Sequence, residues 1–187
     1  MSEFVTEAIM LHKKTIKDKV FSLELFTRDF WKIHCWYTHK HCFLDYGMIL
    51  QVEIQTKIKT NTLKRFKIVS AFPAEGCDLE MILRFLTVMN FFRKASPEGV
   101  PSLSLFWIYK FLFSDFSQKD SEIAYVMWLA FLLLYSGVLD EKEKDTFFWI
   151  MKRCSFVETK ERFSSLSRED LDSKKRNFFQ QLSLYLS

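Results

Sequence analysis

The sequence contains few of the residues that mark turns: only four glycines and three prolines occur in 187 residues. Because these two residues interrupt regular structure most often, their scarcity favours long helices in part of the chain. The sequence also lacks a Walker-type glycine loop, a GxSxG motif and an HExxH motif. The acidic residues form no distinctive pair, so we expect a protein that is not an enzyme.

The four cysteines include no pair at CxxC spacing. Possible zinc ligands do cluster within nine residues, namely His34, Cys35, His39, His41 and Cys42. Strand alternation would point His34 and Cys35 to opposite faces, whereas a zinc site needs four ligands that converge. We therefore expect no metal and no cofactor, and we interpret the cluster as polar loop residues with one buried thiol.

The N-terminal residues form neither a basic n-region nor an apolar h-region, so no secretory signal is recognised. We expect a cytoplasmic protein with reduced thiols. Residues 123–139 are uncharged over 17 positions, which is the lower limit for crossing a bilayer. A helix buried on all sides in a bundle explains this run without a membrane, although a membrane-associated protein is an open alternative.

Hydrophobic residues are abundant, at 49% of the chain with 21 phenylalanines, and this excludes overall disorder. The positive charge is unevenly distributed. Residues 1–70 hold 12 lysines and arginines against 7 acidic residues, whereas residues 71–187 hold 15 against 16. The N-terminal part is therefore the part suited to a polyanion, although a surplus of this size is also ordinary in soluble domains.

Alternating polarity predicts five strands in the first 70 residues, at positions 5–12, 20–26, 32–37, 48–55 and 63–69. In the third of these strands Ile33, Cys35 and Tyr37 share one face. Residues 13–19 are interpreted as a charged connection. Five strands in about 70 residues suggest a small barrel of the OB type, whose strand faces and loops commonly hold single-stranded nucleic acid.

The hydrophobic period becomes helical at Asp78, which is a suitable N-cap. Further helices are predicted over about 101–113, 120–137, 146–154 and 169–186, with Gly137 at a helix end and a charged loop at 140–144. The predicted fold class is α+β. Residues 1–72 form a five-stranded OB-type β-barrel and residues 73–187 form an all-α helical domain.

Basic residues of the barrel could follow a phosphate backbone, while Trp31, Trp36 and Tyr37 could stack on bases. The candidate nucleic-acid-binding residues are Lys13, Lys14, Lys17, Lys19, Arg28, Lys32, Lys64, Arg65 and Lys67. We expect Arg65 and Lys67 to face away from Phe66 and Ile68. The alternative is that the lysines form a solvated rim and the aromatic residues belong to the core.

Several short strings resemble RecO, the bacterial recombination mediator family. They are AIML at 8–11, LFTRDFWK at 25–32, LKRF at 63–66, LF at 105–106 and LYSGVL at 134–139. The resemblance implies an OB barrel followed by a helical domain and a non-catalytic role in DNA repair and recombination. It also implies binding and annealing of single- and double-stranded DNA, with recombinase loading alongside RecR and the single-stranded-DNA-binding protein.

Many RecO proteins carry a four-cysteine zinc module in the helical part, and the cysteines for it are missing here. The resemblance therefore also implies no metal in this chain. A protein–protein adaptor, with an OB barrel that does not bind DNA, is the alternative function. Salt-sensitive binding of single-stranded DNA would distinguish the two.

Overall fold

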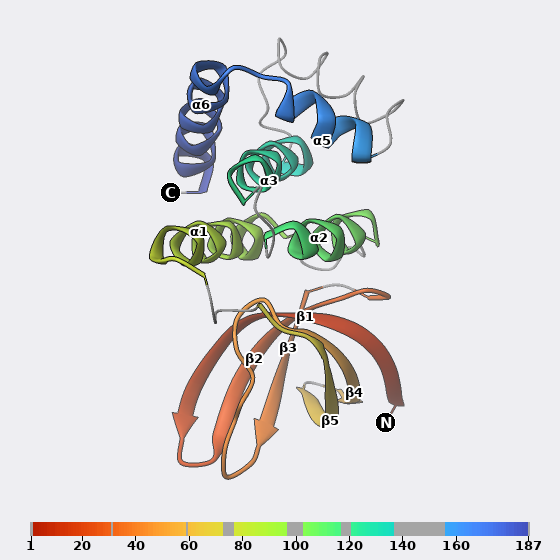
Figure 1. Ribbon diagram of the computed structural model, residues 1–187. Coiled ribbons are helices and arrows are strands. Elements are labelled where there is room, and N and C mark those ends of the chain that lie inside the picture. The colour runs from red at the N-terminus through yellow and green to blue at the C-terminus, as the bar shows by residue number, and fades with distance from the viewer. Residues whose placement is uncertain are drawn as a thin grey trace. The chain divides into compact units, whose positions relative to one another are not determined.

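The computed structural model describes residues 2–30, 32–58, 60–72, 77–96, 103–116, 121–136 and 156–186. Five strands come first and helices follow (Figure 1), as the predicted α+β class requires. The strands are β1 (Ser2–Lys17), β2 (Val20–Thr27), β3 (Lys32–Thr38), β4 (Ile49–Lys57) and β5 (Thr60–Ser70). The helices are α1 (Leu79–Ala95), α2 (Leu103–Phe116), α3 (Ser121–Ser136), α5 (Phe156–Ser164) and α6 (Arg168–Leu186).

The strands hydrogen-bond in the order β1-β2-β3-β5-β4, and β1 also pairs with β4, so the sheet closes on itself. All neighbours are antiparallel except β3 and β5, which run parallel at Cys35–Asn61 and Trp36–Thr62. Because β1 is long, its first half pairs with β4 and its second half with β2. The pairing of β3 with β5 is short, since two residue pairs join these strands in the described sheet.

Alternate residues of each strand fill the interior of this closed sheet, as the period-2 pattern predicted. Ile33 and Cys35 of β3 are buried there, and Tyr37 packs against the same cluster. From the other strands the buried members are Ala8, Met10, Leu23, Leu25, Leu50, Val52, Ile54 and Leu63. The interior that these strands enclose is therefore largely aliphatic.

The expected charged connection at 13–19 is wrong for most of its length. Residues 13–17 continue β1 and pair with β2, and only Asp18 and Lys19 form the turn. Lys19 takes a left-handed conformation, with φ of 61°. Charged side chains are tolerated on this part of β1 because most of them point to solvent.

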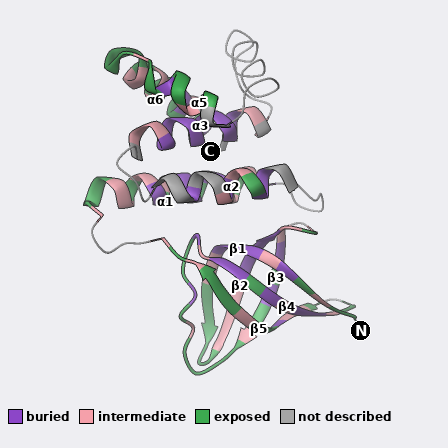
Figure 2. Ribbon diagram, turned by 45° about the vertical axis from the view of Figure 1, so that its right-hand side comes forward, coloured by how far each residue is buried: buried purple, intermediate pink, exposed green. Residues whose placement is uncertain are grey.

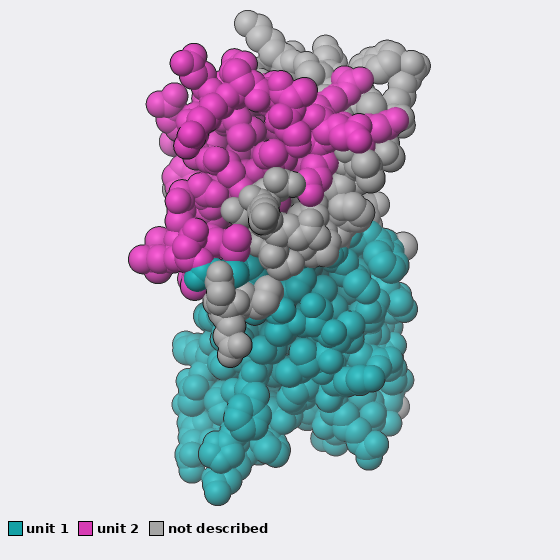
Figure 3. Space-filling view, in the orientation of Figure 1, with its two compact units in different colours: residues 1–77, 96–113 teal, residues 78–95, 114–187 magenta. Residues whose placement is uncertain are grey.

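The chain divides into two compact units: residues 1–77 with 96–113, and residues 78–95 with 114–187 (Figure 3). This division differs from the predicted boundary at residue 72, because part of α2 groups with the strands. The Tyr109 hydroxyl donates a hydrogen bond to the Gly47 carbonyl at 2.7 Å. Lys110 forms an ion pair with Glu7 of β1 at 2.8 Å.

The second unit is a bundle of α1, α3, α5 and α6. Met81 N donates to Asp78 Oδ1 at 2.7 Å, which confirms Asp78 as the N-cap of α1. Most of α3 is buried (Figure 2), and Trp128 meets Phe92 of α1 edge to face. The described part of the uncharged run, residues 123–136, thus lies in a central helix of this unit. Among the described residues, no helix combines the length and apolar character needed to traverse a bilayer.

Helix α5 was not expected from the sequence, because its only described buried side chain is Phe163. The predicted helix at 146–154, the predicted charged loop at 140–144, Gly137 and Trp31 lie outside the described residues. Helix α6 matches the predicted segment closely.

Candidate nucleic-acid interface

One row of side chains crosses the outside of β1, β2 and β3. Lys14 is opposite Ser22, and Ser22 is opposite Trp36, so strand register places all three on the same face. Lys14 is exposed, and Trp36 is 41% exposed although large. Opposite residues in neighbouring strands are about 5 Å apart, so Lys14 and Trp36 are about 10 Å apart.

The β1–β2 turn extends this face with two more lysines. Lys17 is opposite Val20, and Val20 is opposite Thr38. Both Lys17 and Lys19 are exposed. The Lys19 carbonyl accepts a hydrogen bond from His39 N at 3.0 Å, which ties the turn to the connection after β3. We call the set Lys14, Lys17, Lys19, Ser22, His34 and Trp36 the β2–β3 face.

Three of the nine candidate cations interact with groups within the protein instead. The Lys13 amine donates to the Leu44 carbonyl at 2.6 Å and to the Cys42 carbonyl at 3.5 Å. Lys32 lies 3.7 Å from Glu24, and both side chains are less than 10% exposed. The Lys13 and Lys32 amines are thus bound by other groups of the protein. They are therefore poorly placed to contact a phosphate.

Arg28 is the third of these cations. It donates two hydrogen bonds to Asp29, at 2.8 and 2.9 Å, and lies 3.5 Å from Glu7. Hydrogen bonds from Arg28 and then from Thr6 lower the pKa of the Asp29 carboxyl. The Arg28 charge is therefore largely balanced by its neighbours.

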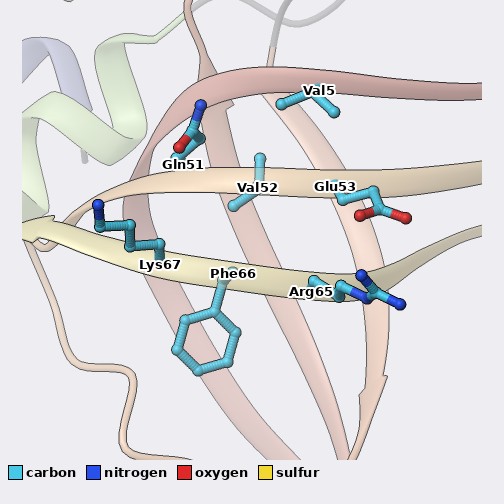
Figure 4. A pocket seen from close by; sticks show the side chains of 7 residues that line it. All are labelled: Val5, Gln51, Val52, Glu53, Arg65, Phe66 and Lys67. Atoms are coloured by element: carbon cyan, nitrogen blue, oxygen red, sulfur yellow. The ribbon is translucent and has the colours of Figure 1, made fainter.

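The β5 cations are exposed but do not all share one face with the β1–β2 lysines. Lys64 comes two residues after Thr62, and Thr62 is the residue of β5 that pairs with Trp36 of β3. Arg65 and Lys67 instead lie opposite Glu53 and Gln51 of β4. They line an open hollow of about 300 Å³ together with Val5, Val52 and Phe66 (Figure 4). The exposed candidate cations thus do not form one surface: Lys14, Lys17 and Lys19 lie on the β2–β3 face, whereas Arg65 and Lys67 lie beside Glu53 of β4.

The predicted facing of β5 is confirmed for Phe66, which packs against the interior cluster. Ile68 is opposite Leu50 but remains 42% exposed. Of the candidate stacking residues, only Trp36 is exposed to solvent within the described chain. Tyr37 points inward, stacks on His39 and meets Phe66 edge to face.

The connection after β3 contains an aromatic residue that the sequence reasoning missed. Phe43 is 72% exposed, whereas its neighbour Leu44 is fully buried and Cys42 packs against the interior. Phe43 could not be singled out from the sequence, because Cys42, Phe43 and Leu44 are all apolar and show no alternation of polarity. It was overlooked since the segment was interpreted as a loop with little charge.

The possible zinc ligands do not converge. No group of three or more His, Cys, Asp or Glu residues able to hold a metal occurs within the described ranges. Cys35 is buried, and its burial raises the pKa of the thiol to about 12. The His39 Nδ1 atom lies 2.8 Å from the His41 carbonyl oxygen, so it takes part in the local loop structure.

Comparisons with known proteins do not identify a family. No protein-family model matches the chain, and a search of curated proteins found no match either. The geometry of the β2–β3 face and the sequence resemblance described above are the features that bear on function.

Proposed function

We propose that the protein is a non-catalytic DNA-binding protein of DNA repair and recombination, which holds single-stranded DNA on the β2–β3 face of an OB-type barrel. The observation that carries the proposal is the exposed Trp36 in one row with Lys14 on the outside of the sheet. Closure of five strands, with β3 and β5 as parallel neighbours, supports the OB assignment.

The two kinds of side chain serve complementary purposes in such a site. An exposed indole can stack on any base, because every base has a π-face. The amines of Lys14, Lys17 and Lys19 can neutralise phosphates and release counterions, which makes binding salt-dependent. This combination binds single strands with little sequence preference.

The wider role follows from the resemblance to RecO. We propose that the protein acts in the cytoplasm, anneals complementary strands, also binds double-stranded DNA, and helps to load recombinase with RecR and the single-stranded-DNA-binding protein. The chemistry of the β2–β3 face suits this role because it requires binding to a DNA backbone of any sequence. No reaction on the DNA is needed.

The test is a titration of the protein with a labelled single-stranded oligonucleotide at two salt concentrations, read by fluorescence anisotropy. We expect Trp36→Ala to weaken binding by about 1–3 kcal/mol. We expect the Lys14→Gln, Lys17→Gln double variant to reduce the salt slope by about 0.7 for each phosphate that the variant no longer neutralises.

The Arg65→Ala, Lys67→Ala double variant is the matched comparison, since it removes the same charge from the other surface. If only this variant weakens binding and flattens the salt slope, the β5 surface is the site and the β2–β3 face is not. Absence of salt-sensitive binding by the unmodified protein would favour the adaptor.

A further inference from the structure

We infer that β5 binds an extended acidic segment of another protein, which adds to the sheet as a further strand along residues 64–70. This inference goes beyond the proposed function and does not depend on DNA binding. We call residues 64–70, on the side of β5 away from β4, the β5 edge.

The β5 edge has no neighbouring strand within the described sheet. On one side β5 pairs with β4 as far as Ser70. On the other side β3 joins β5 at two residues, Asn61 and Thr62. Among the described residues, no loop forms a backbone hydrogen bond with residues 64–70. Alternate residues of a strand direct both backbone groups away from an antiparallel partner, so the β5 edge presents such groups to an added strand.

Side-chain exposure agrees with an uncovered edge. Ile68 of β5 is opposite Leu50 of β4, so both belong to the inward side of their strands. Leu50 is fully buried, whereas Ile68 is 42% exposed. Phe66, the inward residue two positions earlier, is only partly buried against the interior cluster. These two apolar side chains are thus covered from the β4 side and remain open at the β5 edge.

Charged and apolar side chains alternate along the β5 edge. Arg65 and Lys67 lie on the outer face, where they border the open hollow (Figure 4). Phe66 and Ile68 alternate with them on the other face. Side chains of an added strand lie about 5 Å from those of its neighbour on the same face. Acidic residues of that strand would therefore meet the two cations, and apolar residues between them would cover Phe66 and Ile68.

The same chemistry disfavours two other occupants. A second copy of the chain, added edge to edge, would bring the cations of β5 opposite one another, and like charges directly opposite are destabilising. Cations on an exposed edge commonly prevent such association. A nucleic acid offers no peptide groups for a strand ladder, and Glu53 lies opposite Arg65 on the outer face. An acidic polypeptide segment satisfies both the backbone groups and the cations.

The experiment measures the binding of labelled seven-residue peptides by fluorescence anisotropy. EVEIEVE has the alternation that the β5 edge requires, and it reads the same in both directions, so it suits either direction of addition. EEVIVEE has the same composition and charge without the alternation, and KVKIKVK has the opposite charge. We expect EVEIEVE to bind at least about 5-fold more tightly than EEVIVEE, and KVKIKVK not to bind.

Backbone pairing is tested separately by N-methylation of EVEIEVE, because a methyl group removes the N–H donor. Alternate residues of a strand direct their N–H groups to the same side. One methylated peptide carries the methyl groups on its glutamates and the other on its apolar residues. We expect one of them to lose binding and the other to retain it. Equal binding of the two methylated peptides would reject strand addition.

The Arg65→Glu, Lys67→Glu double variant should lose binding of EVEIEVE and gain binding of KVKIKVK. The matched control is Arg168→Glu, Arg176→Glu, which makes the same charge change at exposed positions on α6 of the other unit. This control should bind EVEIEVE like the unmodified protein. Thermal melts establish that each variant is folded.

Three results would overturn the inference. If both double variants lose EVEIEVE equally, or if EEVIVEE binds as tightly as EVEIEVE, net charge alone attracts the peptides. If EVEIEVE does not bind the unmodified protein, the acidic segment is rejected. If sedimentation then shows a dimer that Arg65→Glu, Lys67→Glu dissociates, a second copy occupies the β5 edge instead.

Discussion

Lys13 and Lys14 are adjacent in β1 but have different surroundings. The Lys13 amine donates to two loop carbonyls, whereas Lys14 points to solvent on the β2–β3 face. We expect Lys13→Met to lower the free energy of unfolding by about 1–3 kcal/mol, because the Leu44 and Cys42 carbonyls lose a charged donor. Urea denaturation measures this change.

Lys14→Met is the matched control for Lys13→Met, since it makes the same chemical change one residue away. An exposed position should alter the free energy of unfolding by no more than about 0.5 kcal/mol. Lys14→Met should instead weaken binding of the single-stranded oligonucleotide and reduce its salt slope. Equal loss of stability in the two variants would show that the loop carbonyls do not depend on Lys13.

Some residue-scale features were visible in the sequence and others were not. The inward facing of Ile33 and Cys35 was predicted correctly, because alternation alone determines which side of a strand a residue occupies. The partner of Lys32 could not be predicted in this way. Glu24 comes beside it only through the pairing of β2 with β3.

At the scale of the element, the β1–β2 turn contains a conformation that suits glycine better than lysine. Lys19 has φ of 61°, and a left-handed residue with a Cβ atom costs about 1–2 kcal/mol. Lys19→Gly should relieve this strain, but it also makes the unfolded chain more flexible. We expect a net gain of about 0.5–1 kcal/mol in the free energy of unfolding, together with weaker oligonucleotide binding.

Lys19→Ala separates the two effects, because alanine removes the charge and keeps the Cβ atom. It should weaken binding as much as Lys19→Gly without the gain in stability. Denaturation and anisotropy measurements on the same preparations test both statements. A gain in stability without any loss of binding in Lys19→Gly would mean that the Lys19 amine does not bind DNA.

The elements themselves were predicted with uneven success. β4 was recognised because Leu50, Val52 and Ile54 alternate with polar residues, and all three are buried. Residues 13–17 of β1 were missed, since cations at both inward and outward positions hide the alternation there. α3 was expected as a buried helix, because charge is absent from it beyond Glu122.

At the scale of the whole molecule, the grouping of α2 with the strands was beyond the sequence. It depends on interactions such as that between Tyr109 and Gly47, which are 62 residues apart. The candidate site was also predictable only in part, because it too depends on which distant segments come together in the fold. Charge composition indicated the basic half of the chain, but only the closed sheet separates the β2–β3 face from the hollow beside Arg65 and Lys67.

The Tyr109 hydrogen bond gives a test of this long-range grouping. Tyr109 is fully buried, and its burial raises the pKa of the hydroxyl well above the usual value, so the group stays neutral as a donor. We expect Tyr109→Phe to cost about 1–2 kcal/mol, because the Gly47 carbonyl loses its donor. Hydrogen exchange should quicken at the Gly47 amide and at the Met10 amide, which binds Met48 beside it.

The control for Tyr109→Phe is Tyr185→Phe, which removes an exposed hydroxyl from α6 in the other unit. It should leave the unfolding midpoint and the exchange of these amides unchanged. Faster exchange confined to α2, with the Gly47 and Met10 amides as protected as before, would contradict the grouping of α2 with the strands.

The order of the chain has a consequence during protein synthesis. β5 ends at Ser70, but Tyr109 and Lys110 leave the ribosome about 40 residues later. At about 5–20 residues per second, the finished strands wait for about 2–8 s before their helix arrives. During that interval the Gly47 carbonyl and the Glu7 carboxylate lack the partners that α2 later supplies. A chaperone that meets the nascent chain at this stage therefore meets five strands whose fold is not yet complete.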